Sequence, residues 1–246
     1  MLILLPPSEG KTAPTTGPPV DLEALVYADA LTESRRKLLG ALAALAELPL
    51  ERAVSMLAVS PGQAGEVAVD AELSSAPAGP AAAVYTGVLY DRLRLPELPK
   101  RAQGRVLIAS ALWGVVRPGD HIPYYRLSAK AKLEGVGGLA GFWRPALAAA
   151  LPDKEGTLVV DMRSGAYAAA WKPQRATLVA VRAFSESGGK RKAVSHMAKA
   201  VRGEVARALL ESKSVPKTPE AAAEVASAAG FKVELTPGAL DVIVPA

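Results

Sequence analysis

The chain has 246 residues and half of them are apolar, so it can bury a large core in one domain or in two small ones. It contains no cysteine, which excludes disulfides, thiolate metal sites and cysteine-based peroxide chemistry, and its two histidines leave little from which to build a transition-metal centre. We therefore expect no metal and no cofactor. The formal net charge of +5 favours a polyanionic partner. The chain has neither an apolar window of about 18 residues nor the start of a signal peptide, so we expect a cytoplasmic protein without membrane contact.

The amino terminus predicts a buried strand followed by a loop. Residues 1–5 form an apolar run that two prolines end. The Gly-Lys-Thr sequence around Lys11 matches part of a phosphate-binding P-loop, but Leu5 stands where the motif needs its first glycine. The proline-rich segment that follows does not begin a helix. We therefore reject a P-loop and keep Lys11 as a candidate anion contact.

Two predicted helices come before a short turn with a distinctive spacing. The apolar periodicity predicts helices at residues 32–47, with Thr32 as the N-cap, and at residues 49–59. Ser60 and the Pro-Gly-Gln after it supply an N-cap and a capping box for the next helix. Residues 61–68 follow the helix-hairpin-helix spacing Pro-Gly-x-Gly-x-x-x-Ala, with alanine in place of the second glycine.

In a helix-hairpin-helix element, backbone amides at the start of the second helix point at a phosphate of the DNA backbone. Ser60, Gly62 and Gly65 are therefore candidate DNA contacts. An ordinary capped helix accounts for the same residues, and the sequence leaves both interpretations open.

The strongest strand candidate, residues 105–113, runs into a loop rich in groups that can bind a ligand. The loop carries Arg117, Asp120, Tyr125 and Arg126. Such a loop at the end of a buried strand is a common construction for a binding site, and loop rigidity with solvated charges is the alternative interpretation. The aromatic wall of the expected cleft consists of Tyr85, Trp113 and Tyr125.

A second buried strand is predicted at residues 157–162, and polar residues gather at its end. Asp161, Arg163 and Ser164 follow one another there. Asp161 and Arg163 either form a structural ion pair or take part in chemistry, because strand ends are a frequent location for catalytic groups.

Residues 182–213 form the most basic segment, with eight basic against three acidic residues. On a helix, Arg191, Lys192, Lys199, Arg202 and Arg207 share one arc and apolar residues occupy the opposite arc. Two interpretations are open. The arc is a solvated helix face, or it is a surface that contacts phosphates.

The remaining elements complete a mixed architecture. Helices are predicted at residues 142–151 and 219–229, and strands at 177–184, 233–235 and 242–244. Strands and helices do not alternate regularly, so we expect one α+β domain over residues 1–246. It should have a mixed β-sheet flanked by helices and a helix-hairpin-helix-like element.

Six ordered motifs resemble the YaaA-like peroxide stress protein family, over nearly the whole chain. Besides the opening Leu-Leu-Pro-Pro-Ser with its Lys-Thr, these motifs are Val84-Tyr85-Thr86-Gly87, residues 112–118, residues 123–127, Phe142-Trp143, Ser164-Gly165-Ala166-Tyr167 and residues 198–203. The family continues past Leu127 with one residue and then Met-Gly, whereas Ala129 and Lys130 stand here.

The resemblance implies a cytosolic protein that limits oxidative damage to DNA under peroxide stress and is associated with lowered free iron. It also implies a mixed α/β fold that binds DNA through a positively charged cleft and a helix-hairpin-helix element. Without cysteine and with two histidines, the chain should neither consume peroxide catalytically nor hold iron tightly.

We expect binding to DNA with little sequence preference, and the rival hypothesis is an enzyme that acts on a small anionic or phosphate-bearing substrate. In the enzyme, arginines would hold the anion, Asp161 would be the general base and Lys199 would stabilise developing charge. Either activity would use one groove with Arg126, Arg163, Lys199 and Arg202 on its floor and Asp161 paired to one of these cations. The full set of expected DNA or anion contacts is Lys11, Arg117, Arg126, Arg163, Lys192, Lys199, Arg202, Arg207, Ser60, Gly62 and Gly65.

Overall fold

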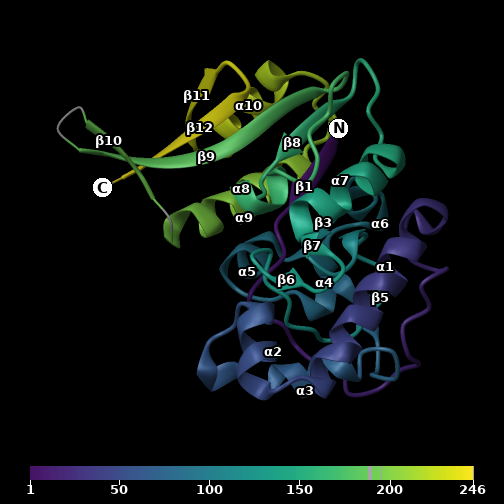
Figure 1. Ribbon diagram of the computed structural model, residues 1–246. Coiled ribbons are helices and arrows are strands. Elements are labelled where there is room, and N and C mark those ends of the chain that lie inside the picture. Colours follow the sequence, from purple (N-terminus) through teal and green to yellow (C-terminus); the bar gives the residue numbers. More distant parts are fainter. Residues whose placement is uncertain (188–189, 195, 246) are drawn as a thin grey trace.

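The computed structural model describes residues 1–187, 190–194 and 196–245, and its centre is an eight-stranded mixed sheet (Figure 1). The strand order is β11-β12-β9-β8-β1-β3-β4, and β10 pairs with β9 outside this path. The strands of this sheet are β1 (Leu2–Leu5), β3 (Val106–Ser110), β4 (Gly114–Val116), β8 (Leu158–Asp161), β9 (Thr177–Ser187), β10 (Lys190–Ala193), β11 (Lys232–Thr236) and β12 (Ala239–Pro245). Two small ribbons pair β2 (Gly79–Pro80) with β5 (His121–Ile122) and β6 (Lys132–Leu133) with β7 (Gly137–Gly138).

The direction of the central strands decides where a site can form. β1 runs parallel to β3 on one side and to β8 on the other, and β8, β9 and β12 continue the parallel pairing. Only β4, β10 and β11 pair antiparallel in this sheet, among the described residues. The chain therefore leaves β1, β3 and β8 at the same edge of the sheet, after Leu5, Ser110 and Asp161. The continuous apolar sequences of these strands fit this arrangement, because both sheet faces are covered.

Helices cover the sheet and form a second group beyond its edge (Figure 1). α9 packs between β9 and α5, α10 packs on β11, and α7 contacts α1. Helices α1, α2 and α3 gather below the sheet in Figure 1. The α-helices are α1 (Ala28–Ala43), α2 (Leu50–Leu57), α3 (Glu66–Ala71), α4 (Ala81–Val84), α5 (Val88–Leu93), α6 (Lys100–Gln103), α7 (Leu139–Ala150), α8 (Gly165–Ala168), α9 (His196–Glu211) and α10 (Pro219–Ala228). Short 3₁₀ helices occupy Ala44–Glu47, Pro61–Gln63 and Leu95–Glu97.

A glycine sets the close approach of α9 to α5. A Cβ at Gly203 would lie 2.2 Å from the backbone oxygen of Leu89 and 2.9 Å from Cβ of Arg92. No other residue fits there unless the helices move apart. Gly203 therefore fixes the position of the amino-terminal half of α9, which carries Lys199 and Arg202.

The predicted α+β fold with a mixed sheet flanked by helices is confirmed, and most predicted elements are present within a few residues. The first predicted helix starts at Ala28 rather than after Thr32, whose buried side chain lies inside α1. The turn after α2 is a 3₁₀ helix with the predicted Ser60 capping box, and α3 begins only at Glu66. No helix in the described ranges is long and apolar enough to pass through a bilayer.

The largest correction concerns the basic segment. Arg191 and Lys192 do not lie on a helix with Lys199, because residues 190–193 form β10 and pair with β9, Lys192 opposite Ser185. The extended β9 continues past the sheet and offers this short strand a backbone ladder (Figure 1). The helix starts at His196, and residues 188–189 and 195 of the basic segment lie outside the described residues.

Candidate functional site

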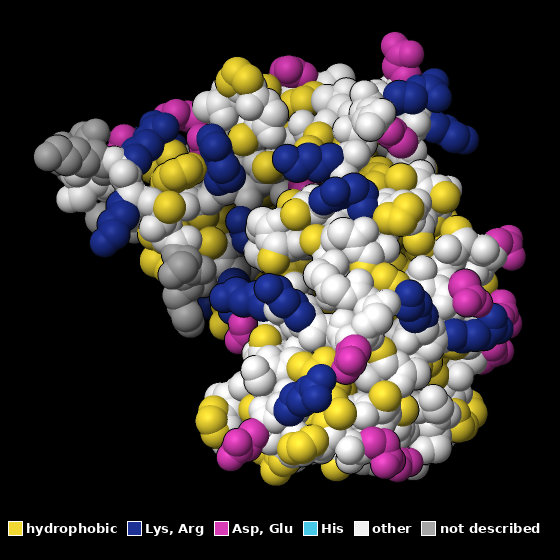
Figure 2. All heavy atoms as spheres, viewed as in Figure 1, with side chains coloured by type: hydrophobic (Ala, Val, Ile, Leu, Met, Phe, Trp, Pro, Cys, Tyr) yellow, Lys and Arg dark blue, Asp and Glu magenta, His cyan; other side chains and the backbone are white. Residues whose placement is uncertain are grey.

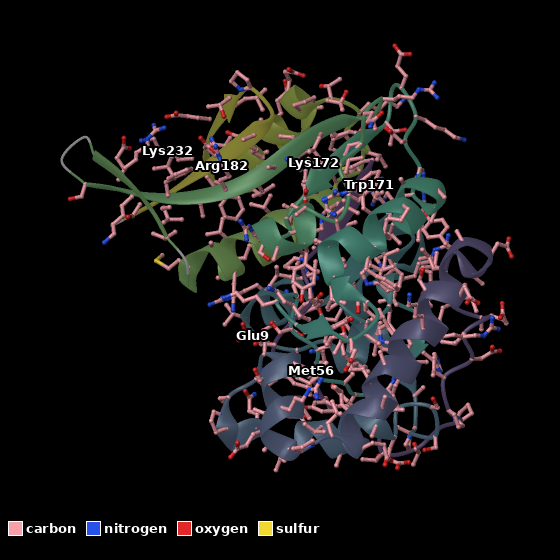
Figure 3. The ribbon with its side chains drawn as sticks, viewed as in Figure 1. Glu9, Met56, Trp171, Lys172, Arg182 and Lys232 are labelled. Carbon is pink, nitrogen blue, oxygen red and sulfur yellow. The ribbon has the colours of Figure 1, made fainter. Side chains whose placement is uncertain are left out.

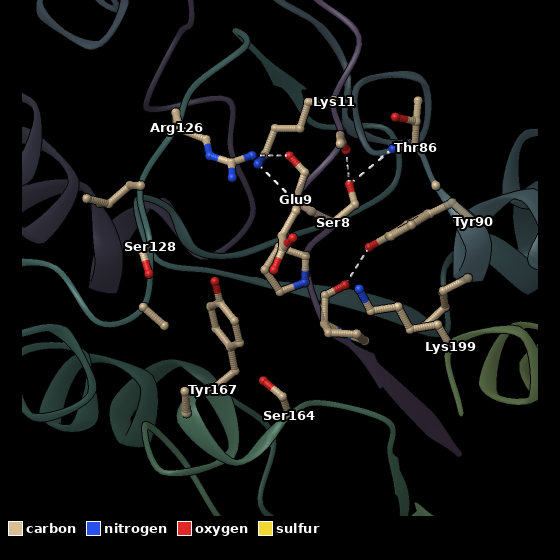
Figure 4. A pocket seen from close by; sticks show the side chains of 18 of the residues that line it. Ser8, Glu9, Lys11, Thr86, Tyr90, Arg126, Ser128, Ser164, Tyr167 and Lys199 are labelled. Carbon is tan, nitrogen blue, oxygen red and sulfur yellow. Dashed lines mark hydrogen bonds between the residues drawn. The ribbon is translucent and has the colours of Figure 1, made fainter. Parts of the chain in front are cut away.

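A pocket of about 650 Å³ opens where the chain leaves β1 (Figure 4). Six segments form its walls: the loop after β1, residues 58–59 after α2, residues 86–90 with the start of α5, the loop at residues 125–130, the start of α8, and α9. In Figure 3, Glu9 lies between the sheet and Met56 of α2. The polar side chains in the lining are Ser8, Glu9, Lys11, Thr86, Tyr90, Tyr125, Arg126, Ser128, Lys130, Ser164, Tyr167, Lys199 and Arg202. The location agrees with the rule that ligands of open sheets bind beyond the carboxyl ends of parallel strands.

Lys11 lies at the inner wall of the pocket (Figure 4). Its Nζ donates a hydrogen bond to the backbone oxygen of Ser8 at 2.9 Å. The same nitrogen lies 4.6 Å from the ring centroid of Tyr125 and 5.8 Å from that of Tyr85. Burial lowers the pKa of Lys11 to about 8, and the charge of Arg126 adds to the decrease. A substantial fraction of this amine is therefore neutral near physiological pH.

Two tyrosines beneath Lys11 belong to a buried hydrogen-bond chain. The hydroxyls of Tyr85 and Tyr125 are 2.8 Å apart, and the Tyr125 hydroxyl is 2.7 Å from Oγ of Ser110. Oγ of Ser110 in turn accepts hydrogen bonds from the backbone nitrogens of Leu112 and Trp113. Burial raises the pKa values of both tyrosines, so they stay neutral beside the end of β3.

The expected aromatic wall is formed only in part. Of the three predicted aromatics, Tyr125 is among the pocket residues, whereas Tyr85 and Trp113 are buried behind it. Trp113 makes an edge-to-face contact with Tyr125 at 6.1 Å between ring centroids. These two side chains therefore position the wall rather than face the pocket.

Arg126 is anchored to two other segments. Its Nη1 donates to the backbone oxygen of Glu9 at 2.7 Å, and its backbone nitrogen donates to Oδ1 of Asp70 at 2.8 Å. Asp70 is buried on α3, and its Oδ2 has no hydrogen-bond partner among the described residues. Burial raises the pKa of Asp70 to about 7. Sequence reasoning missed Asp70, although a carboxylate in a short helix after a capping box was a signal that could have found it.

Helix α9 adds two cations to the pocket. Lys199 is exposed and lies beside Tyr90, whose hydroxyl donates to the backbone oxygen of Pro6 at 2.7 Å (Figure 4). Arg202 is half-buried and its Nε donates to the backbone oxygen of Val181 at 3.1 Å. Burial lowers the pKa of Arg202, so its charge is poorly solvated. The backbone of β9 thereby fixes one of the two cations, and the other is free to reach a ligand.

Asp161 and Arg163 form an ion pair, the first of the two interpretations that the sequence left open, and neither is among the pocket residues. Nε and Nη2 of Arg163 donate to Oδ1 and Oδ2 of Asp161 at 2.9 and 2.8 Å, and the two side chains are 2% and 6% exposed. Arg163 also donates to the backbone oxygens of Tyr167 and Trp171. The expected groove with Arg163 on its floor is therefore wrong. The structure therefore does not support Asp161 as a general base or Arg163 as an anion contact. Both side chains are buried, and each is hydrogen-bonded to the other.

The other predicted cations lie elsewhere. Arg117 is exposed, with its guanidinium 6.0 Å from the ring of Tyr27. Arg207 pairs with Glu97 and Glu211. Lys192 is exposed on β10. None of the three is among the pocket residues.

The structure brings together only part of the predicted site. The predicted residues that it places in the pocket are Lys11, Tyr125, Arg126, Ser164, Lys199 and Arg202. Ser60, Gly62 and Gly65 are not among the pocket residues, although Ser60 directly follows the pocket residue Val59 in the chain. The polar pocket residues that sequence reasoning had not proposed as contacts are Ser8, Glu9, Thr86, Tyr90, Ser128, Lys130 and Tyr167.

These features define an α+β protein with a pocket rich in cationic side chains beyond the carboxyl end of a central parallel strand. A family model described as "Peroxide stress protein YaaA" matches residues 1–235, so the chain belongs to this family. A UPF0246 protein of Streptomyces coelicolor is 42% identical over 259 residues, covering 99% of this chain and 98% of that protein. A UPF0246 protein of Corynebacterium efficiens is 41% identical over 243 residues, covering 97% and 96%. An uncharacterised protein of Campylobacter jejuni is 33% identical over 137 residues, covering 54% and 53%.

Proposed function

We propose that this peroxide stress protein acts in the cytoplasm by binding DNA with little sequence preference and thereby limits oxidative DNA damage. The observation that carries the proposal is the charge of the pocket. Five cationic side chains line it against one carboxylate, that of Glu9. The cations are Lys11, Arg126, Lys130, Lys199 and Arg202. They come from three separate parts of the chain, so their convergence is a property of the fold.

The distribution of charge around the pocket supports the same proposal. In Figure 2 the middle of the visible face carries mainly Lys and Arg side chains, whereas Asp and Glu lie mostly toward its lower part and edges. Contacts between such cations and backbone phosphates give affinity without reading the base sequence. The exposed turn at Ser60, Gly62 and Gly65 lies beside the pocket residue Val59 and would supply a further phosphate contact through backbone amides.

The test uses two pocket lysines that have no structural hydrogen bond among the described residues. Lys130→Glu combined with Lys199→Glu should weaken binding to a duplex at least tenfold and make the logarithmic salt slope shallower by about 2 units, near 1 per lost phosphate contact. Arg202 is avoided because its guanidinium donates to the backbone of β9 at Val181. Fluorescence anisotropy with labelled duplex at several salt concentrations measures both quantities.

The matched control applies the same charge change outside the pocket. Lys37→Glu with Lys213→Glu changes two exposed lysines, one on α1 and one just beyond the end of α9. Measured along the axis of α9, Lys213 lies about 20 Å from Lys199. The control should keep the salt slope of the unmodified protein. Equal losses in both double variants would show that net charge alone, and not this pocket, governs binding.

The pocket volume favours a second candidate, an enzyme for a small anionic or phosphate-bearing substrate. About 650 Å³ lies within the range of small-molecule sites. Thermal-shift measurements with nucleotides and sugar phosphates test it, since a ligand at 100 times its dissociation constant stabilises by about 2.7 kcal/mol. The absence of any shift, together with tight duplex binding, would reject this second candidate.

A further inference from the structure

Lys11 differs from the other cations of the pocket in its surroundings. Lys130 and Lys199 are exposed, and the guanidinium groups of Arg126 and Arg202 each donate to a backbone oxygen. The amine of Lys11 also donates to a backbone oxygen, that of Ser8, but it lies against two aromatic rings and forms no ion pair in the described part of the chain. Such an amine, partly desolvated and next to another cation, is the kind that enzymes use as a nucleophile toward carbonyl groups.

We propose that Lys11 is a reactive amine that forms a Schiff base with the aldehyde of a phosphate-bearing sugar held in the pocket. Arg126 and Lys199 hold the phosphate, and the rings of Tyr125 and Tyr167 bound the space for the sugar. Two sources offer this chemistry, namely the open-chain deoxyribose of an abasic site in DNA and a free sugar phosphate. The DNA source rests on the proposed function, and the free sugar phosphate does not.

The reaction is a condensation without a redox change. The lone pair of Nζ adds to the aldehyde carbon and forms a C–N bond while the C=O π bond breaks. The nitrogen then loses its protons, the former carbonyl oxygen leaves as water, and a C=N bond remains. Hydrolysis by one water molecule reverses the step, so the protein is regenerated.

The burial of Lys11, more than the charges around it, favours the neutral amine that this step needs. Burial and the Arg126 guanidinium lower its pKa to about 8, whereas Asp70 and Glu66 of α3 and Glu9 of its own loop act in the opposite direction. At pH 7.4 about 20% of such an amine is neutral, against about 0.1% of an ordinary lysine, a difference of about 200-fold. The neighbouring tyrosines stay protonated, because burial raises their pKa values.

The test traps the Schiff base with cyanoborohydride and locates it by mass spectrometry of tryptic peptides. The probes are a duplex with one abasic site and 2-deoxyribose 5-phosphate, each with the full-length protein. We expect an adduct on Lys11 whose rate rises with pH to a midpoint near 8. Lys11→Arg keeps the charge and should lower the yield at least about 20-fold, whereas Lys132→Arg, at an exposed lysine outside the pocket, should leave it unchanged.

The outcomes separate this inference from DNA binding. A duplex with a tetrahydrofuran abasic analogue has no aldehyde, so its anisotropy measures binding alone. If this duplex does not bind but the sugar phosphate labels Lys11, DNA binding fails and the reactive amine stands, with the free sugar phosphate as its source. If neither probe labels Lys11, or if the yield persists in Lys11→Arg, the inference is overturned. A melting temperature of Lys11→Arg within about 2 °C of the unmodified protein shows that the variant is folded.

Discussion

Replacing Gly203 by alanine should destabilise the protein even though alanine is the better helix former. In a helix interior the exchange normally gains about 1 kcal/mol. At Gly203 the new Cβ would lie 2.2 Å from the backbone oxygen of Leu89, an atom that no side-chain rotation can move. α9 and α5 must therefore separate, and such overpacking costs about 1–3 kcal/mol or more.

We expect the steric cost to exceed the propensity gain and leave a net loss of about 2 kcal/mol in the free energy of unfolding. For a chain of this length, 1 kcal/mol corresponds to roughly 2–4 °C, so the melting temperature should fall by about 4–8 °C. Urea denaturation and calorimetry measure the two quantities. Since α9 carries Lys199 and Arg202, duplex binding should weaken as well.

Gly40 provides the matched control. It lies inside α1, is exposed, and a Cβ there would meet nothing within 4 Å. Gly40→Ala should therefore raise the free energy of unfolding by about 0.5–1 kcal/mol. If Gly203→Ala is as stable as the unmodified protein, or if both variants change stability in the same direction, the close approach of α9 to α5 is not the reason for the glycine.

Two further predictions concern buried charges. The pKa of Asp70 is raised to about 7 in the native state, against about 3.9 in the unfolded state, so the native state binds the Asp70 proton more tightly. The stability that this proton contributes is lost as the pH rises from about 4 to 7. Asp70→Asn should remove up to about 3 kcal/mol of this pH dependence in urea denaturation at pH 5 and pH 8, because about two pKa units separate pH 5 from the native pKa, and identical profiles would contradict it. Arg163→Met leaves the Asp161 carboxylate buried without its partner and should cost about 3–5 kcal/mol in the same assay, whereas Arg36→Met, in an exposed pair, should cost less than about 1 kcal/mol. Similar losses in the free energy of unfolding for the two arginine variants would show that water or another group stabilises the Asp161 carboxylate when Arg163 is removed.

The strands and the family were accessible from the sequence because both depend on local patterns. The continuous apolar run that becomes β3 can only be buried, and residues 157–162 show the same property. The order of the short motifs was sufficient to indicate the family. The Asp161–Arg163 pair was also accessible, since the two residues are near neighbours in the chain and leave the same strand.

The membership of the pocket was decided by the tertiary structure alone. Helical periodicity placed Lys192 with Lys199, but pairing with β9 made residues 190–193 a strand, because backbone hydrogen bonds to an existing strand outweigh a weak helical preference. Arg163 and Arg126 carry the same charge, yet Arg163 is buried in an ion pair with Asp161 whereas Arg126 lines the pocket. The sequence by itself thus determined which groups the chain carries and which segments are apolar. The packing of α9 on α5 and of Asp70 beneath Arg126 decided which of those groups meet, because such contacts join segments far apart in the chain and leave no local pattern.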